Sequence, residues 1–255
     1  MKRWDLIVTV LLFVLGALCF IFFDVRPITI LEDPLSNMLL CGFLSRVGVG
    51  LFFGWLLYKF GGRYLMVFNR SFIKNLAWSL PCFMVAFVNF PYAALISGEA
   101  SVISTNAMGF YILYIVSVAF LEELIFRGAL LVLLNDFLRN TKHKPLLIAL
   151  IGAGAFSLYH LTNILMGADV GFTLLQCAYT FLIGGMLMIT VMRTKNIWLC
   201  ILIHAIFDFG GLLIIHLGTG NPWDLVFWIL TIVSGLLCAG HIIFSLIKLE
   251  KDYVS

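Results

Sequence analysis

Three motifs within the apolar runs of this 255-residue chain contain ionisable side chains. In the first, Glu122 and Glu123 are adjacent, and Arg127 follows four residues after Glu123. This spacing puts Glu123 and Arg127 on one helix face, where they can pair. Glu122 is turned about 100° away and has no local cation, so desolvation disfavours its charged form. Adjacent carboxylates in opposite environments predict a structural role for Glu123 and a chemical role for Glu122.

The other two motifs carry imidazoles at the same helical spacing. Phe156 and His160 are four residues apart, so the aromatic ring can form the wall of a pocket that the imidazole enters. His204 and Asp208 are also four residues apart. The carboxylate can therefore orient the imidazole and fix its tautomer.

This combination of side chains suits hydrolysis. Glu122 can take a proton from a water molecule that His160 holds, while His204 and Asp208 face the developing oxyanion. The same four side chains also match a catalytic zinc site, with two histidines, two carboxylates and an open position. The sequence does not separate the two mechanisms. It predicts no certain cofactor and leaves open a Zn²⁺ ion bound by Glu122, His160, His204 and Asp208.

The composition indicates the environment of these residues. Hydrophobic residues make up 62% of the chain and charged residues only 11%, with a mean hydropathy of +1.09. Soluble domains carry about 25% charged residues, so a soluble fold of this size would lack a polar surface. The sequence has no basic face with interleaved aromatic residues, so it does not suggest a nucleic-acid partner. The six cysteines lie in apolar runs without a CxxC motif, as is typical of small hydrophobic residues.

Apolar stretches of about 20 residues can cross a hydrocarbon core of about 30 Å. About eight stretches are long enough, at residues 6–23, 38–58, 76–96, 109–134, 146–166, 171–192, 197–216 and 225–247. The segments that connect them are short and leave no room for a soluble domain. The sequence therefore predicts an all-α fold, a polytopic bundle of about eight transmembrane helices.

The charges of the loops orient these spans. Basic residues gather before span one and after spans two, four, six and eight, at Lys2, Arg3, Lys59, Arg63, Arg70, Lys74, Arg139, Lys142, Lys144, Arg193, Lys195, Lys248 and Lys251. The alternate loops hold Arg26 as their one basic residue, together with several acidic residues. The positive-inside rule then places both termini in the cytoplasm. Arg46, inside the second span, is expected to be a counter-ion for Glu123 or Asp208, or to extend toward the interface.

Charged groups near the bilayer centre are costly, by at least about 2.5–3.5 kcal/mol on insertion scales, and usually carry function. Proton-coupled transport also uses buried Glu and His, and it is the first alternative to hydrolysis. No internal repeat and no pair of Gly/Pro-broken spans supports it. The second alternative is a non-catalytic immunity or scaffold protein, in which the Glu–Arg pair only locks helices together.

Taken together, the three motifs resemble those of the CAAX protease and bacteriocin-processing (CPBP, or Abi) family of intramembrane endopeptidases. They are Glu122-Glu123-x-x-x-Arg127, Phe156-x-x-x-His160 and His204-x-x-x-Asp208, in that order and on three spans. The family includes enzymes that trim prenylated CAAX tails, and its bacterial members are associated with peptide maturation or with self-immunity to bacteriocins. The resemblance covers about residues 108–217. It implies a catalytic core there, preceded by three spans in 1–107 and followed by one span and a cytoplasmic tail in 218–255.

The resemblance also implies roles for the residues. Glu122 with His160 would activate the attacking water, and His204 with the residue at position 208 would stabilise the oxyanion. Position 208 is Asp here, whereas the prenyl-protein branch has Asn. An ionised Asp cannot donate a hydrogen bond to an oxyanion, so Asp208 is expected to be protonated, to orient His204 or to bind a metal.

Glu123, Arg127 and Phe156 would support these groups. The family has been described both as metal-dependent and as metal-free glutamate peptidases, so the zinc alternative stays open. The expected protein is a multi-pass endopeptidase of the cell membrane. It would cleave a peptide or a membrane protein near the cytoplasmic side of the bilayer, without a nucleic-acid partner. The sequence predicts no oligomeric state.

Overall fold

The computed structural model describes residues 3–67 and 71–254. Lys2 and Arg70, which contribute to the predicted charge pattern, lie outside these residues. The described chain consists almost entirely of helices, in the order α1 (Arg3–Phe20), η1 (Ile21–Val25), α2 (Pro34–Lys59), η2 (Gly62–Leu65), α3 (Phe72–Trp78), α4 (Leu80–Val88), α5 (Tyr92–Ser97), η3 (Thr105–Ala107), α6 (Met108–Glu123), η4 (Leu124–Ala129), α7 (Leu130–Phe137), α8 (Lys144–Tyr159), α9 (Thr162–Leu165), α10 (Val170–Thr194), α11 (Ile197–Leu217) and α12 (Leu225–Val254).

Seven helical segments among the described residues are long and apolar enough to cross a membrane, at Ile7–Val25, Pro34–Lys59, Leu80–Ser97, Lys144–Leu165, Val170–Thr194, Ile197–Leu217 and Leu225–Tyr253. They correspond to seven of the expected spans. The remaining expected span, 109–134, is built from α6, η4 and α7 in succession, because the α-helix ends at Glu123 and continues as a π-helical turn. The predicted polytopic helical bundle is confirmed, and the span count is close to the expected eight.

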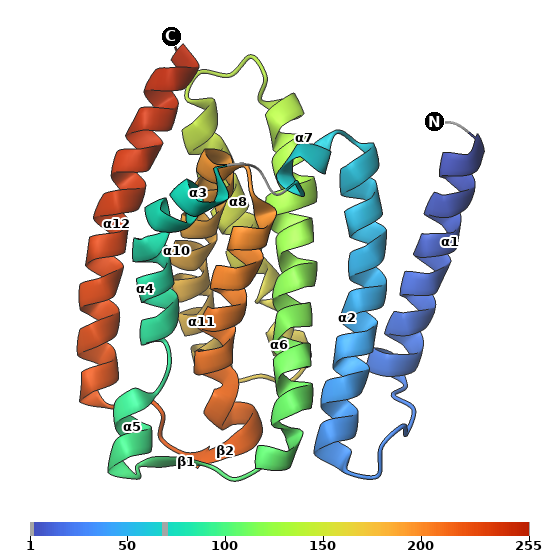
Figure 1. Ribbon diagram of the computed structural model, residues 1–255, viewed down its shortest axis with the longest axis vertical. Coiled ribbons are helices and arrows are strands. Elements are labelled where there is room, and N and C mark those ends of the chain that lie inside the picture. Colours follow the sequence, from blue (N-terminus) through green and yellow to red (C-terminus); the bar gives the residue numbers. More distant parts are fainter. Residues whose placement is uncertain (1–2, 68–70, 255) are drawn as a thin grey trace.

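The helices stand side by side in the bundle (Figure 1). α1 and α2 form a pair at one edge, and α6 packs against α2 on one side and α11 on the other. α4 packs between α11 and α12, while α8 and α10 pair behind them. Helix α11 therefore lies in the middle of the bundle, in contact with α4, α6 and α10.

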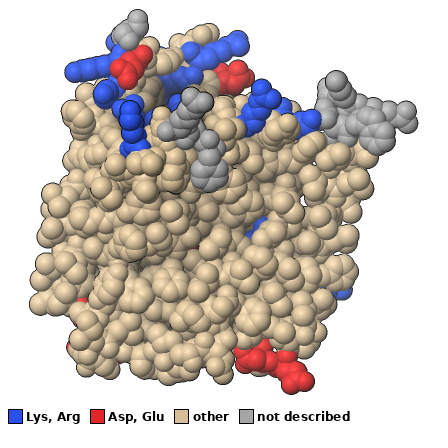
Figure 2. Space-filling view, viewed as in Figure 1, with Lys and Arg blue, Asp and Glu red and all other residues tan. Residues whose placement is uncertain are grey.

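Both ends of the chain lie at the same end of the bundle, and Figure 2 shows most Lys and Arg side chains gathered there. Acidic side chains without basic neighbours lie at the opposite end. The charge rule assigns the basic end to the cytoplasm. This arrangement agrees with the predicted position of both termini.

Side-chain caps set the start of the helices that matter for the site. The Asn196 side chain accepts hydrogen bonds from the backbone N–H groups of Trp198 and Leu199, at 2.9 and 3.3 Å, and so begins α11. Asp33 does the same for α2 by accepting from Ser36 N at 2.8 Å. Hydrogen bonds from Ser36 hold the pKa of the Asp33 carboxyl below its ordinary value.

A small antiparallel sheet closes the end of the bundle opposite the termini. β1 (Ala100–Val102) pairs with β2 (Gly218–Gly220), with Ser101 opposite Thr219. The sheet was not expected, because three-residue strands give no periodic signal in a sequence. It joins the loop before α6 to the end of α11, so the helices that carry Glu122 and His204 are also connected away from the site.

Helix α11 touches the break between α4 and α5 at Gly210. A Cβ atom at Gly210 would lie 2.7 Å from Phe90 Cα and 2.8 Å from Phe90 N, both backbone atoms that cannot move alone. We expect Gly210→Ala to lower the free energy of unfolding by about 1–3 kcal/mol through overpacking. Thermal unfolding of the purified protein in detergent measures this.

Gly235→Ala, in α12, is the matched control, because nothing lies within 4 Å of the added Cβ atom. Helix propensity alone favours this substitution. A loss at Gly235 as large as the loss at Gly210 would show that contact with the α4–α5 break is not the cause.

Candidate active site

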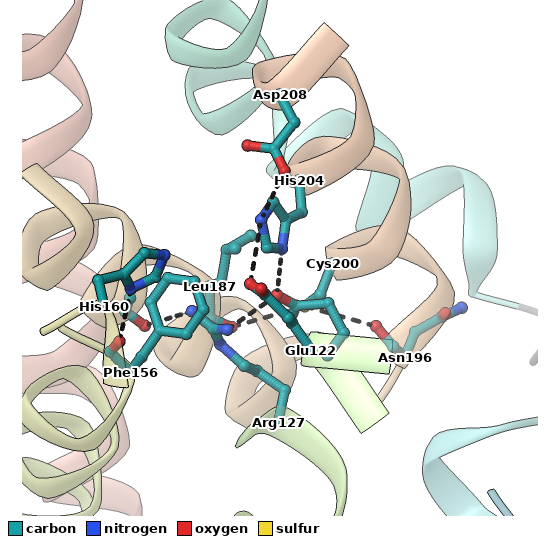
Figure 3. A network of polar contacts seen from close by, with 11 residues as sticks. Glu122, Arg127, Phe156, His160, Leu187, Asn196, Cys200, His204 and Asp208 are labelled. Atoms are coloured by element: carbon teal, nitrogen blue, oxygen red, sulfur yellow. Dashed lines mark hydrogen bonds and ion pairs between the residues drawn. The ribbon is translucent and has the colours of Figure 1, made fainter. Parts of the chain in front are cut away.

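The motif residues come from three contacting parts of the bundle. α6 ends with the carboxylate pair, at the point where the π-helical turn η4 begins. Turns of this kind are frequent at functional sites. Arg127 from η4, Phe156 from α8, His160 directly after α8, and His204 and Asp208 from α11 complete the site. Figure 3 labels Glu122, Arg127, Phe156, His160, His204 and Asp208.

Glu123 and Arg127 form a fully buried ion pair. Arg127 Nη1 donates to Glu123 Oε1 at 2.8 Å, and both side chains have 0% of their surface exposed. Arg127 Nη2 lies 3.4 Å from the carbonyl oxygen of Gly184, and the guanidinium carbon lies 4.2 Å from the centre of the Phe156 ring. The pair has the i,i+4 contact that the spacing predicts. It belongs to the core that joins η4 to α8 and α10.

His204 is held between carboxylates from two helices. Its Nδ1 donates to Glu123 Oε1 at 2.8 Å. Its Nε2 lies 3.3 Å from Asp208 Oδ2 and 3.8 Å from Glu122 Oε2. Figure 3 shows the ring between Asp208 on one side and the carboxylates of α6 on the other. The bond to Glu123 fixes the orientation of the ring, so that Nε2 faces the two remaining carboxylates.

The three carboxylates differ in their access to solvent. The side chains of Glu122 and Asp208 are 16% and 17% exposed, whereas Glu123 is completely buried. The spacing in the sequence predicts that Asp208 contacts His204. It also predicts that the side chains of Glu122 and Glu123 point in different directions. It missed the bond from Glu123 to His204, because helical periodicity pairs residues within one helix and not across two.

Phe156 and His160 form the wall on the side of α8. The Phe156 ring meets the His160 ring edge-on at 5.0 Å and the His204 ring at 5.8 Å, between ring centres. His160 Nδ1 donates to the carbonyl oxygen of Phe156 at 2.9 Å, because a carbonyl can only accept. Nε2 of His160 is then left as an acceptor. Among the contacts of the described residues, His160 makes no ion pair or hydrogen bond with Glu122 or His204.

Arg46 has a different partner from the one expected. Its Nη1 atom lies 3.6 Å from Asp24 Oδ1 and donates to the carbonyl oxygen of Gly42 at 3.0 Å. Its guanidinium also stacks on Tyr114, 4.9 Å from the ring centre. The expectation of a counter-ion for Glu123 or Asp208 is wrong. Asp24 lies in η1, the π-helical turn that follows α1, and this turn brings its carboxylate to Arg46.

The donor atoms of the site do not meet in the arrangement of a metal centre. Among the described residues, no group of three or more His, Cys, Asp or Glu side chains could hold a metal ion. The zinc alternative therefore gains no support from the arrangement of the described side chains.

What remains is a partly exposed carboxylate beside an oriented imidazole within the helix bundle. Such a pair can move a proton and stabilise a developing negative charge. Residues 104–210 match the family described as Type II CAAX prenyl endopeptidase Rce1-like. The matched segment contains every residue of the three motifs. The same comparisons find no curated protein and no solved structure that matches the chain.

Proposed function

Residues 104–210 match the Rce1-like family of type II CAAX prenyl endopeptidases, and on this premise we propose that Glu122 activates water for peptide-bond hydrolysis within the membrane. The chain is a multi-pass membrane protein of a CAAX-type intramembrane protease family. The finer assignments of residues, substrate and compartment are our proposal. In it, residues 108–217 form the catalytic core, flanked by the spans of 1–107 and by 218–255.

The observation that carries the proposal is the fixed orientation of His204. Glu123 holds Nδ1 at 2.8 Å, so Nε2 is presented toward Glu122 and Asp208. An imidazole that is oriented through one nitrogen can act with the other on a reacting group. Glu122 is the carboxylate of the adjacent pair that is accessible to water.

In the proposed reaction, Glu122 takes a proton from a water molecule, and the water oxygen attacks the carbonyl carbon of the scissile bond. His160 positions the same water by accepting a hydrogen bond at Nε2. The carbonyl oxygen becomes negative and is stabilised by the N–H group of His204 Nε2. Glu122 then passes its proton to the leaving amine as the peptide bond breaks.

Asp208 has a role in this scheme that does not require it to donate a hydrogen bond. Its carboxylate lies 3.3 Å from His204 Nε2 and favours the protonated imidazole that the oxyanion needs. This use of Asp differs from that expected for an Asn at the same position. We propose that the substrate is a peptide or a membrane protein and that the protein lies in the cell membrane. A prenyl group on the substrate is one property that the experiment tests.

The purified protein in liposomes, incubated with a prenylated peptide that ends in a CAAX sequence, tests the activity directly. Mass spectrometry should detect release of the C-terminal residues. In parallel, N-terminal proteomics of cells with and without the protein should find new peptide ends that depend on it. Uptake of peptide into the liposomes under a pH gradient, without cleavage of either kind, would instead identify a proton-coupled transporter and overturn the proposal.

A further inference from the structure

The turn of α11 that carries Asp208 is held by side chains from two other spans. Asn89 Nδ2 donates to the carbonyl oxygen of Phe207 at 2.7 Å. The Tyr111 hydroxyl donates to the carbonyl oxygen of Phe209 at 2.7 Å and lies 3.4 Å from that of Asp208. The three carbonyl groups contacted are consecutive, with Asp208 at their centre.

The two donors come from different elements of the fold. Asn89 lies in the break between α4 and α5, and its amide nitrogen would be 2.5 Å from a Cβ atom at Gly211. The absence of a side chain at Gly211 thus allows the approach. Tyr111 is a residue of α6 and is completely buried, and its ring lies 5.5 Å from that of Phe209.

The carboxylate of Asp208 depends on this backbone for its position. Among the described residues, its only ion pair or hydrogen bond is the contact with His204 Nε2 at 3.3 Å. The side chain is also partly exposed, so close packing does not fix it. The distance between Asp208 and His204 is therefore set by the turn of α11 from which both side chains project.

We propose that Asn89 and Tyr111 are positioning residues that hold Asp208 against His204, a role that rests on the function proposed above. A carbonyl oxygen in a helix has two lone pairs, and only one of them is used by the N–H group four residues later. The side-chain donors take the second. They resist rotation of the turn and so keep the carboxylate in place beside His204 while negative charge develops on the carbonyl oxygen of the substrate.

Tyr111→Phe tests this role, since it removes the hydroxyl group and keeps the buried ring. We expect kcat for the peptide cut by the wild-type protein to fall about tenfold, with KM and the melting temperature close to wild type, because misplaced reacting groups cost rate and not binding. Asn89→Ala should act in the same direction. Tyr114→Phe, on the same helix, is the matched control, because its ring stacks on Arg46 and meets α11 at His216, away from the turn that carries Asp208.

A double-mutant cycle separates positioning from a general structural role. Tyr111→Phe should have no further effect on kcat in an Asp208→Ala background, because the group that it positions is absent. If Asp208→Ala leaves no measurable cleavage, the single variants decide: a kcat for Tyr111→Phe and Asn89→Ala equal to that of Tyr114→Phe overturns the positioning role. The same tenfold loss in both backgrounds overturns the positioning role and leaves the peptidase function standing. A wild-type protein that cleaves neither the CAAX peptide nor any cellular peptide refutes the function itself.

Discussion

Glu122→Gln is expected to lower the rate of peptide cleavage by about 10²–10⁴-fold, the usual contribution of a general base. The amide has nearly the shape of the carboxylate, but it cannot take a proton from water. Glu122 is the partly exposed carboxylate of the two adjacent glutamates and takes no part in the buried ion pair of Glu123 with Arg127. The melting temperature of the variant should therefore stay near that of the wild type. Initial rates of cleavage in liposomes measure the effect.

The adjacent carboxylate provides a matched control for this prediction. Glu123→Gln removes a charge at the next position, but this side chain accepts bonds from both Arg127 and His204. Its substitution should lower the melting temperature together with the rate. Wild-type cleavage by Glu122→Gln would remove the central residue of the proposed mechanism. A common fall in melting temperature for both variants would mean that Glu122 is structural as well.

Arg127→Ala is expected to lower the free energy of unfolding by about 3–5 kcal/mol, the usual cost of removing one partner of a buried ion pair. The substitution leaves Glu123 buried without its cation, and it also removes the guanidinium from the face of the Phe156 ring. Thermal or denaturant unfolding in detergent micelles measures the loss.

Arg46→Ala is the control for this prediction, because its partner Asp24 lies at 3.6 Å and both side chains are partly exposed. Exposed pairs contribute only about 0–1 kcal/mol. Equal losses of stability for the two arginine variants would contradict the view that Glu123 and Arg127 form the buried centre of the bundle.

Patterns within a single helix were the part of the structure that the sequence predicted well. The apolar runs predict the spans, because a helix that crosses the lipid mainly needs a sufficient length of apolar residues. Spacing by four residues predicts the contact of Glu123 with Arg127 and that of His204 with Asp208. These contacts depend only on the geometry of the helix that carries both residues.

Contacts between helices were harder to predict, because the rotation and depth of each helix are set by its neighbours. Glu123 reaches His204 across the interface of α6 and α11, and Arg46 reaches Asp24 across that of α2 and η1. Asn89 depends on a break in a span that reads as continuous in the sequence. The prolyl residue at position 91 is the one signal that could have indicated this break.

The pairing of Glu123 with Arg127 inside one stretch of chain also bears on how the protein is made. A chain that enters the membrane from its N-terminus delivers Glu123 to the translocation machinery well before the later helix that carries His204. A partner four residues away is present from the start, so the two charges neutralise each other during insertion and lower the cost of leaving water. Glu122 has no such companion in its own segment. Its imidazole neighbour His204 arrives only with α11, so the contact between the two side chains forms late in biosynthesis.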